Sequence, residues 1–156
     1  MDLLMRLIDD LKKLGWKIST AESCTGGLLA KTITDAPGSS DVFEFGAVVY
    51  SNKFKNKLLG VPKEVLNMYG AVSEETAYAL SKGICEYSDA EVGVGITGIA
   101  GPGGGTKEKP VGLVYYSIYI RQKNIHICEK LLLSGARDEV RSQTVTAVLE
   151  KLKELL

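Results

Sequence analysis

Residues 16–33 read WKISTAESCTGGLLAKTI and contain the most informative pattern for the fold. Its first part, residues 16–20, alternates polar and apolar side chains, which is typical of a half-buried strand. The pair Gly26-Gly27 predicts a tight turn, and residues 28–33 have the apolar spacing of a helix. The sequence therefore predicts a strand that leads through a glycine-rich turn straight into a helix.

Helix and strand patterns are intermixed along the rest of the chain, with one hairpin of two strands near its end. Helices are expected over 3–14 (closed by Gly15), over a short segment capped by Ser51-Asn52 and ended by Gly60, over 62–70, over 73–87, and over a last segment that buries Val140, Thr144, Val148 and Leu152. Strands are expected over 45–50, 92–97, 111–120 and 125–133, with a loop at 37–40. This order predicts a single α/β domain over residues 1–156, a three-layer α/β/α sandwich with a mixed β-sheet.

Composition excludes several classes of function. The 156 residues carry 19 Lys+Arg and 19 Asp+Glu, and this zero formal charge disfavours binding to nucleic acid through its phosphates. No apolar run approaches the roughly 20 residues that cross a bilayer, and charges interrupt any signal-peptide core near the N-terminus. The three cysteines are widely spaced and form no CxxC. We expect a cytoplasmic protein with no metal, no cofactor, and no nucleic-acid or membrane partner.

Ser23 is the first candidate for chemistry. A serine at a strand-to-helix turn lies beside free backbone N–H groups, which can hold a developing oxyanion. The alternative is that Ser23 or Thr25 only caps the helix. The surrounding residues do not form the G-x-S-x-G elbow, because Ala21 and Thr25 occupy its glycine positions. Cys24 is another possible nucleophile, although a buried apolar cysteine is the commoner case.

A serine nucleophile needs a base, and the sequence offers two kinds. His126 is the only histidine, and its place between Ile125 and Ile127 in an alternating strand predicts a residue that faces solvent, which disfavours a Ser-His-Asp triad. The other kind of base is a lysine brought in from elsewhere in the chain.

Lys55 is the lysine that helical geometry favours. On the short helix after Tyr50 it lies about 40° from the apolar direction set by residues 54, 58 and 59, whereas Lys53 and Lys57 lie on the wet side. Burial lowers the pKa of a lysine and so allows the amine to act as a base. The alternative is a lysine whose stem covers apolar surface and whose ammonium stays in water.

Two further segments could bind an anion. The loop from Gly98 to Thr106 is dense in glycine, so its backbone N–H groups can converge on a phosphate, although a mobile surface loop has the same composition. It matches neither the Walker loop nor the dinucleotide G-x-G-x-x-G pattern. Arg137 and Arg141 share one face at the start of the last helix, where an anion would be favourable. The alternative there is a solvated face, with Asp138 and Glu139 pairing locally.

Taken together, these segments resemble one family from end to end. The resemblance is carried by the following motifs in order: Thr20-Ala21-Glu22-Ser23-Cys24-Thr25-Gly26-Gly27, Tyr50-Ser51-Asn52 with Lys55, Gly70-Ala71-Val72-Ser73, and Gly98-Ile99-Ala100-Gly101-Pro102 with Lys109-Pro110-Val111-Gly112. They are similar to the nicotinamide mononucleotide deamidase family, whose members are called PncC or form the C-terminal domain of CinA, the competence/damage-inducible protein.

The resemblance implies an amidohydrolase of pyridine-nucleotide salvage that converts nicotinamide mononucleotide to nicotinate mononucleotide and ammonia. It implies a Ser-Lys mechanism assisted by a tyrosine, with these roles falling on Ser23, Lys55 and Tyr50. It also implies a homo-oligomer, in which a neighbouring subunit could complete the pocket. One departure is Ala136, which stands where the family usually has aspartate before the arginine that corresponds to Arg137.

Our hypothesis assigns the remaining site residues as follows. Oxyanion donors are the backbone groups of Cys24, Thr25 and Gly26, and substrate-binding residues are Asn52, Thr97, Gly98, Gly101, Gly104, Gly105 and Arg137. For Asn52, capping of the Lys55 helix is favoured over contact with substrate. Two other functions stay open: a non-catalytic nucleotide-binding module, and a hydrolase of another amide or ester on a nucleotide-like scaffold.

Overall fold

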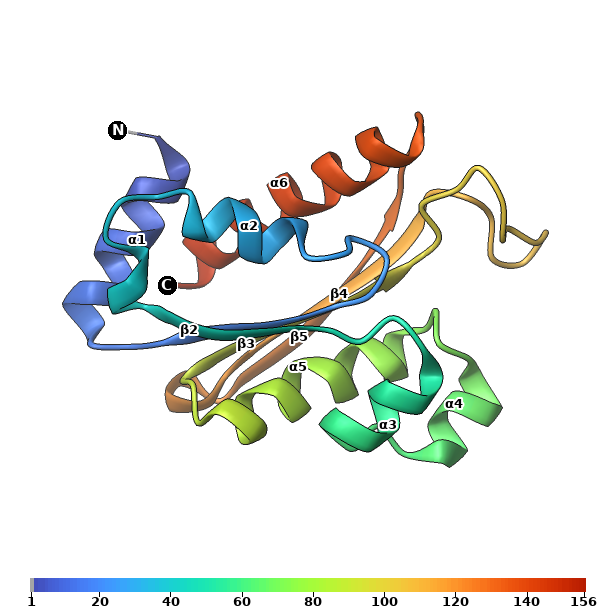
Figure 1. Cartoon of the computed structure of the whole chain (residues 1–156), viewed down its shortest axis with the longest axis horizontal. Helices are drawn as coiled ribbons and strands as arrows, with labels where there is room; N and C mark the ends of the chain where they lie inside the picture. Colours follow the sequence, from blue (N-terminus) through green and yellow to red (C-terminus); the bar gives the residue numbers. More distant parts are fainter. Residues whose placement is uncertain (1) are drawn as a thin grey trace.

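The computed structural model describes residues 2–156; helices and strands alternate in its first part, and three successive helices and three successive strands follow before the last helix (Figure 1). The helices are α1 (Leu3–Leu14), α2 (Leu28–Thr34), α3 (Asn52–Leu59), α4 (Lys63–Tyr69), α5 (Glu74–Ser88) and α6 (Arg137–Leu155). The strands are β1 (Ile18–Glu22), β2 (Phe43–Val48), β3 (Val92–Gly98), β4 (Leu113–Ile120) and β5 (Ile125–Leu132), and short 3₁₀ helices occupy Ser39–Asp41 and Arg121–Lys123.

The five strands form one mixed sheet in the order β2-β1-β3-β4-β5. Strand β1 runs parallel to both β2 and β3, whereas β3, β4 and β5 pair antiparallel. Helices α1, α2 and α6 cover one face of the sheet, and α3, α4 and α5 cover the other (Figure 1). The predicted α/β/α sandwich with a mixed sheet is confirmed. Between residues 2 and 156 no helix combines the length and the apolar character that crossing a bilayer needs.

Each face of the sheet has its own apolar core. The larger core packs α1, α2 and α6 against the sheet, with Leu7, Ile33 and Val148 fully buried. The smaller core packs α3, α4 and α5 around Ala21, with Leu80 and Ile84 fully buried. Because β1 lies between two strands and under helices on both faces, its five residues are all buried. The prediction of a half-buried first strand was therefore wrong.

Two strand boundaries differ from the prediction in a way that affects the site. Strand β1 continues to Glu22, two residues beyond the predicted end, and β2 stops at Val48, so Tyr50 follows the strand instead of ending it. Parallel pairing of Glu22 with Val48 and with Ile96 brings the carboxyl ends of three strands together. The segments that leave these ends, in an open α/β sheet, are where ligand sites usually form.

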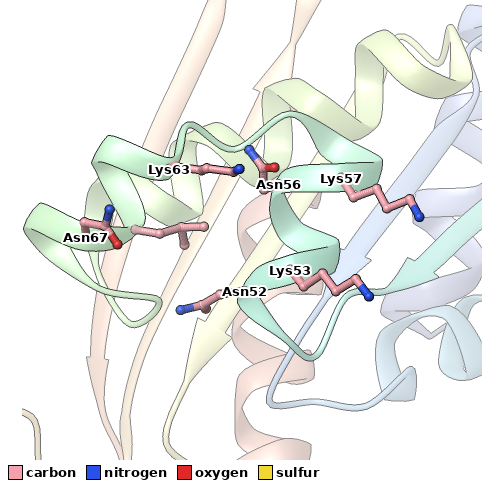
Figure 2. Close-up of a pocket in the computed structure, with 7 residues that line it drawn as sticks. Asn52, Lys53, Asn56, Lys57, Lys63 and Asn67 are labelled. Atoms are coloured by element: carbon pink, nitrogen blue, oxygen red, sulfur yellow. The ribbon is translucent and has the colours of Figure 1, made fainter.

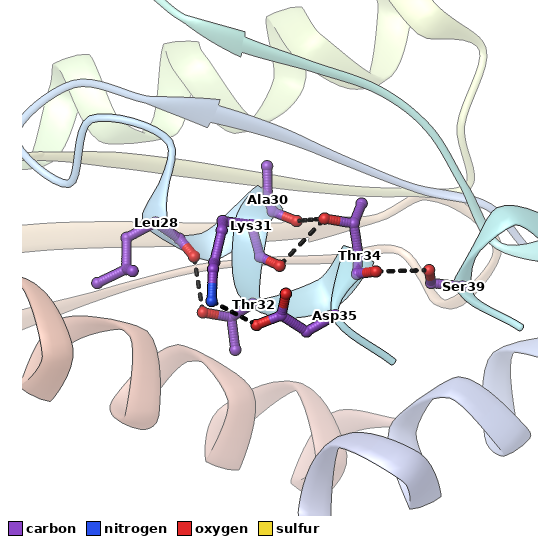
Figure 3. A network of polar contacts seen from close by, with 7 residues as sticks. All are labelled: Leu28, Ala30, Lys31, Thr32, Thr34, Asp35 and Ser39. Carbon is purple, nitrogen blue, oxygen red and sulfur yellow. Dashed lines mark hydrogen bonds and ion pairs between the residues drawn. The ribbon is translucent and has the colours of Figure 1, made fainter. Parts of the chain in front are cut away.

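Helix α2 is short, and polar contacts join its C-terminal end to the segment that follows (Figure 3). The hydroxyls of Thr32 and Thr34 donate hydrogen bonds to carbonyl oxygens of the preceding turn, Leu28 O at 2.7 Å and Ala30 O at 2.8 Å. Lys31 pairs with Asp35 at 2.7 Å, and the Ser39 hydroxyl donates to Thr34 O at 3.4 Å. The predicted loop at 37–40 thus runs into a 3₁₀ turn that begins at Ser39.

Glycines in β3 allow α5 to pack unusually close to the sheet, and this predicts a stability effect. A Cβ on Gly95 would lie 2.6 Å from Ser81 N and 2.7 Å from Ala77 O, both backbone atoms of α5. We expect Gly95→Ala to lower the free energy of unfolding by about 1–3 kcal/mol, because α5 must move. Urea denaturation measures this. The control is Gly103→Ala, since nothing lies within 4 Å of a Cβ there; equal stability of the two variants would contradict the packing argument.

Candidate active site

Ser23 and Lys55 meet at the carboxyl end of the parallel strands. Ser23 directly follows β1, and its N–H donates to Ile96 O of β3 at 3.1 Å. Lys55 lies on α3, which follows β2, and its Nζ lies 3.0 Å from Ser23 Oγ. The same Nζ donates to Val49 O and to Tyr50 O, both at 2.9 Å. The amine is therefore held by three oxygens, one of which belongs to the candidate nucleophile.

This arrangement suits an amine that gains and loses a proton. A neutral amine has two N–H groups, which the carbonyls of Val49 and Tyr50 accept, and one lone pair, which is left for the hydroxyl proton of Ser23. A protonated amine donates to all three oxygens instead. Proton transfer between Ser23 and Lys55 therefore needs no movement of the heavy atoms.

Burial of Lys55 agrees with the sequence prediction. The side chain is only 1% exposed, and desolvation lowers its pKa below the ordinary lysine value. No ion pair joins it to a carboxylate anywhere in residues 2–156. Phe54, one of the residues that set the predicted apolar direction, is 46% exposed. The helix instead buries Lys55 and Leu59, and the buried amine of Lys55 is hydrogen-bonded to Ser23, Val49 and Tyr50.

A buried carboxylate, Glu22, shapes the turn that carries Ser23. Its side chain accepts hydrogen bonds from Thr25 Oγ1 at 2.7 Å, Leu29 N at 2.8 Å and Ala30 N at 3.0 Å. Glu22 thus caps α2 from the end of β1, although Gly27 is the helix N-cap residue and has no side-chain bond. The sequence alone did not predict a role for Glu22. The sequence signal for such a role was the position of Glu22 directly before Ser23. Its two backbone hydrogen-bond partners lie seven and eight residues further along the chain, and only the folded turn brings them close to the carboxylate.

Of the predicted oxyanion donors Cys24, Thr25 and Gly26, not all have a free backbone N–H. The Gly26 N–H donates to Ser23 O at 3.0 Å and closes a turn, so it is already used. Thr25 uses its hydroxyl for Glu22, and over residues 2–156 its backbone N–H has no protein acceptor. The prediction was wrong for Gly26, because the chain reverses there before α2 begins at Leu28.

Cys24, the alternative nucleophile, is 5% exposed, and burial raises the pKa of its thiol to about 11. At neutral pH the thiol is therefore protonated, and the thiolate is the nucleophilic form of cysteine. Cys24 packs in the larger apolar core, as expected for a buried cysteine.

Tyr50 and Arg137 approach each other across the cleft. Arg137 donates to Gly101 O at 2.6 Å and to the Tyr50 hydroxyl at 3.1 Å. Both partners are uncharged, and within residues 2–156 no ion pair neutralises Arg137, so its positive charge is available to an anion. The alternative of local pairing with Asp138 and Glu139 was wrong. The Tyr50 group that contacts Lys55 is the backbone carbonyl, and its hydroxyl bonds Arg137 instead.

A cleft of about 240 Å³ joins these groups. Its walls come from the turn after β1, the segment after β2, helix α3, the loop before α5, the end of β3 with the glycine loop that follows it, and the start of α6. The residues that line the cleft are Ser23, Cys24, Tyr50, Lys55, Ala71, Val72, Thr97, Gly98, Ile99, Ala100, Gly101, Gly103, Gly104 and Arg137. Of the predicted substrate-binding residues, Gly105 and Asn52 are not on these walls. The sequence analysis assigned no role to Ala71 and Val72, which Thr97 holds in place by donating to Ala71 O at 2.7 Å.

Asn52 lies on a different pocket, between α3 and α4 (Figure 2). That pocket measures about 490 Å³ and is lined by Asn52, Lys53, Asn56, Lys57, Lys63, Leu66 and Asn67. The predicted cap at Ser51-Asn52 is confirmed for Ser51, which accepts from Phe54 N at 3.3 Å, and is wrong for Asn52, which is the first helical residue.

His126 lies away from Ser23, in a cluster under α5. Its Nε2 is 3.0 Å from Ser81 Oγ and 3.2 Å from Tyr78 O, and burial lowers its pKa. The ring packs between Tyr78 and Tyr119, with centroids 4.7 and 4.8 Å away. The prediction of a solvent-facing histidine was wrong, because α5 covers this part of the sheet. In residues 2–156 no group of three His, Cys, Asp or Glu side chains is placed to hold a metal ion.

Fold and site together define a class: three-layer α/β proteins that hold a serine against a buried lysine where the parallel strands end. The family model described as the CinA C-terminal domain matches residues 2–156, and the chain belongs to this family.

Curated relatives and solved structures agree with this assignment. The chain is 47% identical, over 94% of its length, to a putative competence-damage inducible protein of Caldanaerobacter subterraneus subsp. tengcongensis, and 47% identical over 96% to a CinA-like protein of Kosmotoga olearia. It spans about a third of these relatives, 35% and 36% of their lengths.

Among solved structures, the competence/damage inducible protein CihA from Agrobacterium tumefaciens aligns with a TM-score of 0.95 and 44% identity, covering 98% of this chain and 93% of that one. A CinA superfamily protein from Escherichia coli aligns at 0.94 and 32% identity, covering 99% and 88%.

The three hydrogen bonds that Glu22 accepts predict that its side-chain oxygens stabilise the fold. In Glu22→Gln one acceptor oxygen is replaced by an NH₂ group that faces other donors. We therefore expect the free energy of unfolding to fall by about 1–3 kcal/mol. Urea denaturation measures this, with Glu108→Gln, which replaces an exposed loop residue, as the control. Equal midpoints for both variants would contradict the capping role of Glu22.

Proposed function

We propose that the chain is an amidohydrolase that converts nicotinamide mononucleotide to nicotinate mononucleotide and ammonia. The observation that carries the proposal is the 3.0 Å contact between Lys55 Nζ and Ser23 Oγ in a cleft whose other walls are glycine-rich backbone and Arg137. The resemblance of the Ser23, Tyr50 and Lys55 motifs to the deamidase family supports the choice of substrate.

The first half of the reaction acylates Ser23. Neutral Lys55 takes the proton of the hydroxyl, and Oγ attacks the carboxamide carbon of the nicotinamide ring. The oxygen of that carboxamide becomes negative, and the N–H groups of Cys24 and Thr25 are the donors that stabilise it. Lys55 then returns its proton to the leaving nitrogen, the C–N bond breaks, and ammonia departs.

The second half restores the serine. A water molecule gives a proton to Lys55 and attacks the ester carbon, and the proton passes back to Ser23 Oγ as nicotinate mononucleotide leaves. The substrate assists both halves, because its pyridinium ring is cationic and a nearby cation disfavours the protonated form of Lys55.

The other end of the substrate is an anion. We assign its 5′-phosphate to Arg137 and to backbone N–H groups of the glycine loop, with Gly101 and Gly104 on the cleft walls. Arg137 then holds the phosphate end of the substrate in the same cleft that contains Ser23 and Lys55. Assembly of the chain as a homo-oligomer, with a neighbouring subunit at the cleft, stays a prediction.

Replacement of the nucleophile tests the activity itself. Ser23→Ala should abolish ammonia release from nicotinamide mononucleotide, while calorimetry still detects binding of the substrate. The matched control is Ser81→Ala, because Ser81 is the serine paired with His126 and is fully buried; this variant should keep its turnover. Equal turnover in Ser23→Ala and the wild type would contradict the serine mechanism. Binding by a wild-type chain that releases no ammonia would favour a nucleotide-binding module instead.

The pH dependence tests the base. The neutral fraction of Lys55 increases with pH, so kcat/KM should rise with pH and level off above the pKa of Lys55, which burial places below the ordinary lysine value. Lys55→Arg keeps a charge that cannot be lost, and we expect it to reduce kcat/KM at neutral pH by at least about 100-fold. Lys53→Arg, on the exposed side of the same helix, is the control. Neutral-pH activity in Lys55→Arg would exclude Lys55 as the base.

A further inference from the structure

The turn that follows Ser23 leaves one peptide unit without a bond of its own. Residues 23–26 form a β-turn, closed by the bond from Gly26 N–H to Ser23 O. In such a turn the peptide between the two central residues, here Cys24 and Thr25, takes no part in the closing bond. Its orientation therefore has to be determined by something outside the turn.

Arg141 supplies that constraint from α6. Its Nε donates to Cys24 O at 2.9 Å, across 117 positions of sequence. Its guanidinium also covers the turn, since a Cβ on Gly26 would lie 3.3 Å from one of its terminal nitrogens. In a trans peptide the C=O and the N–H point in opposite directions. By holding Cys24 O, Arg141 directs the Thr25 N–H away from itself.

The backbone angles agree with this orientation. A flip of the central peptide converts a type I turn to type II and requires a positive φ at its third residue, here Thr25. Within residues 2–156 the non-glycine residues with positive φ are Asp89 and Asn124, so Thr25 is not among them. A β-branched residue resists the left-handed region, and Arg141 and Thr25 thus favour the same orientation.

The Thr25 N–H is also one of few donors left free at this turn. Ser23 N–H bonds Ile96 O, Gly26 N–H bonds Ser23 O, and Leu28 N–H bonds Thr25 O. The next N–H groups, of Leu29 and Ala30, bond the Glu22 carboxylate. A charged donor on a carbonyl polarises the whole peptide unit, which makes the N–H of that unit a stronger donor.

We propose that Arg141 is a positioning residue for the reaction: through Cys24 O it aims and polarises the Thr25 N–H as an oxyanion donor. The inference rests on the proposed function, which supplies the reaction, and on the geometry of the turn, which identifies Arg141 as the residue. It gives Arg141 a role different from that of Arg137, because Arg137 is on the cleft walls, whereas Arg141 lines a separate pocket together with Thr25 and acts through the carbonyl of Cys24, which is on the cleft walls.

Two variants and a matched control test the inference. Arg141→Met removes the donor, and Arg141→Lys restores one charged donor without the planar geometry. The control is Arg121→Met, because Arg121 also donates to a backbone carbonyl, that of Cys85, at the opposite end of β3. Thermal unfolding, followed by circular dichroism, establishes that each variant is folded at the assay temperature.

The first readout is the kinetics with nicotinamide mononucleotide. Loss of a direct oxyanion donor costs about 10²–10³ in kcat, so for Arg141→Met, which misaligns one of two donors, we expect a fall in kcat of roughly 10–100-fold with KM within about 3-fold. Arg141→Lys should recover part of kcat, and Arg121→Met should match the wild type. An unchanged kcat in Arg141→Met, or a rise in KM that accounts for the whole loss, would overturn the inference.

A second readout separates this inference from the choice of substrate. An alkyl fluorophosphonate reacts with an activated serine: Oγ bonds to phosphorus, fluoride leaves, and the serine proton passes to Lys55. The phosphoryl oxygen then needs the same donors. If the wild type labels at Ser23 but releases no ammonia, the substrate assignment fails, and slower labelling of Arg141→Met still supports the inference. Equal labelling rates would overturn it, as would a wild-type Ser23 that does not react with the probe.

Discussion

The structure depends on a single buried amine. Lys55 Nζ lies among Ser23 Oγ, Val49 O and Tyr50 O at 2.9–3.0 Å, with 1% of the side chain exposed. Burying a charged lysine without a carboxylate is costly, so the fold favours the neutral form. The two carbonyls accept the N–H groups of that neutral amine, and the remaining lone pair faces the serine. The same three contacts thus satisfy the buried amine and orient its lone pair toward Ser23.

The rest of the site holds the serine opposite that amine. Strand β1 ends at a turn that two charged residues hold from different sides: Glu22 bonds Thr25 and the first N–H groups of α2, and Arg141 bonds Cys24 O from α6. The sheet and the helical layer of α2 and α6 therefore meet at one short segment. The glycine loop and Arg137 close the other side of the cleft and leave a positive charge there.

Most of the fold could be predicted from the sequence, because apolar periodicity and glycine turns are local signals. Lys55 could also be predicted, from its phase on a helix. The residues that were missed depend on tertiary contacts. Glu22 bonds a helix that starts six residues later, and Arg141 bonds a carbonyl 117 positions away. His126 was placed wrongly because no pattern within its own strand reveals that α5 covers it.

The most direct test is a titration of Lys55 by NMR, with ¹³C labels at the lysine Cε positions and Lys55→Arg to assign the signal. The account predicts that the Lys55 signal titrates at a lower pH than those of the exposed lysines, because burial lowers its pKa. It also predicts that Ser23→Ala leaves the amine buried and its pKa still lowered. A Lys55 signal that titrates together with the surface lysines would contradict the account.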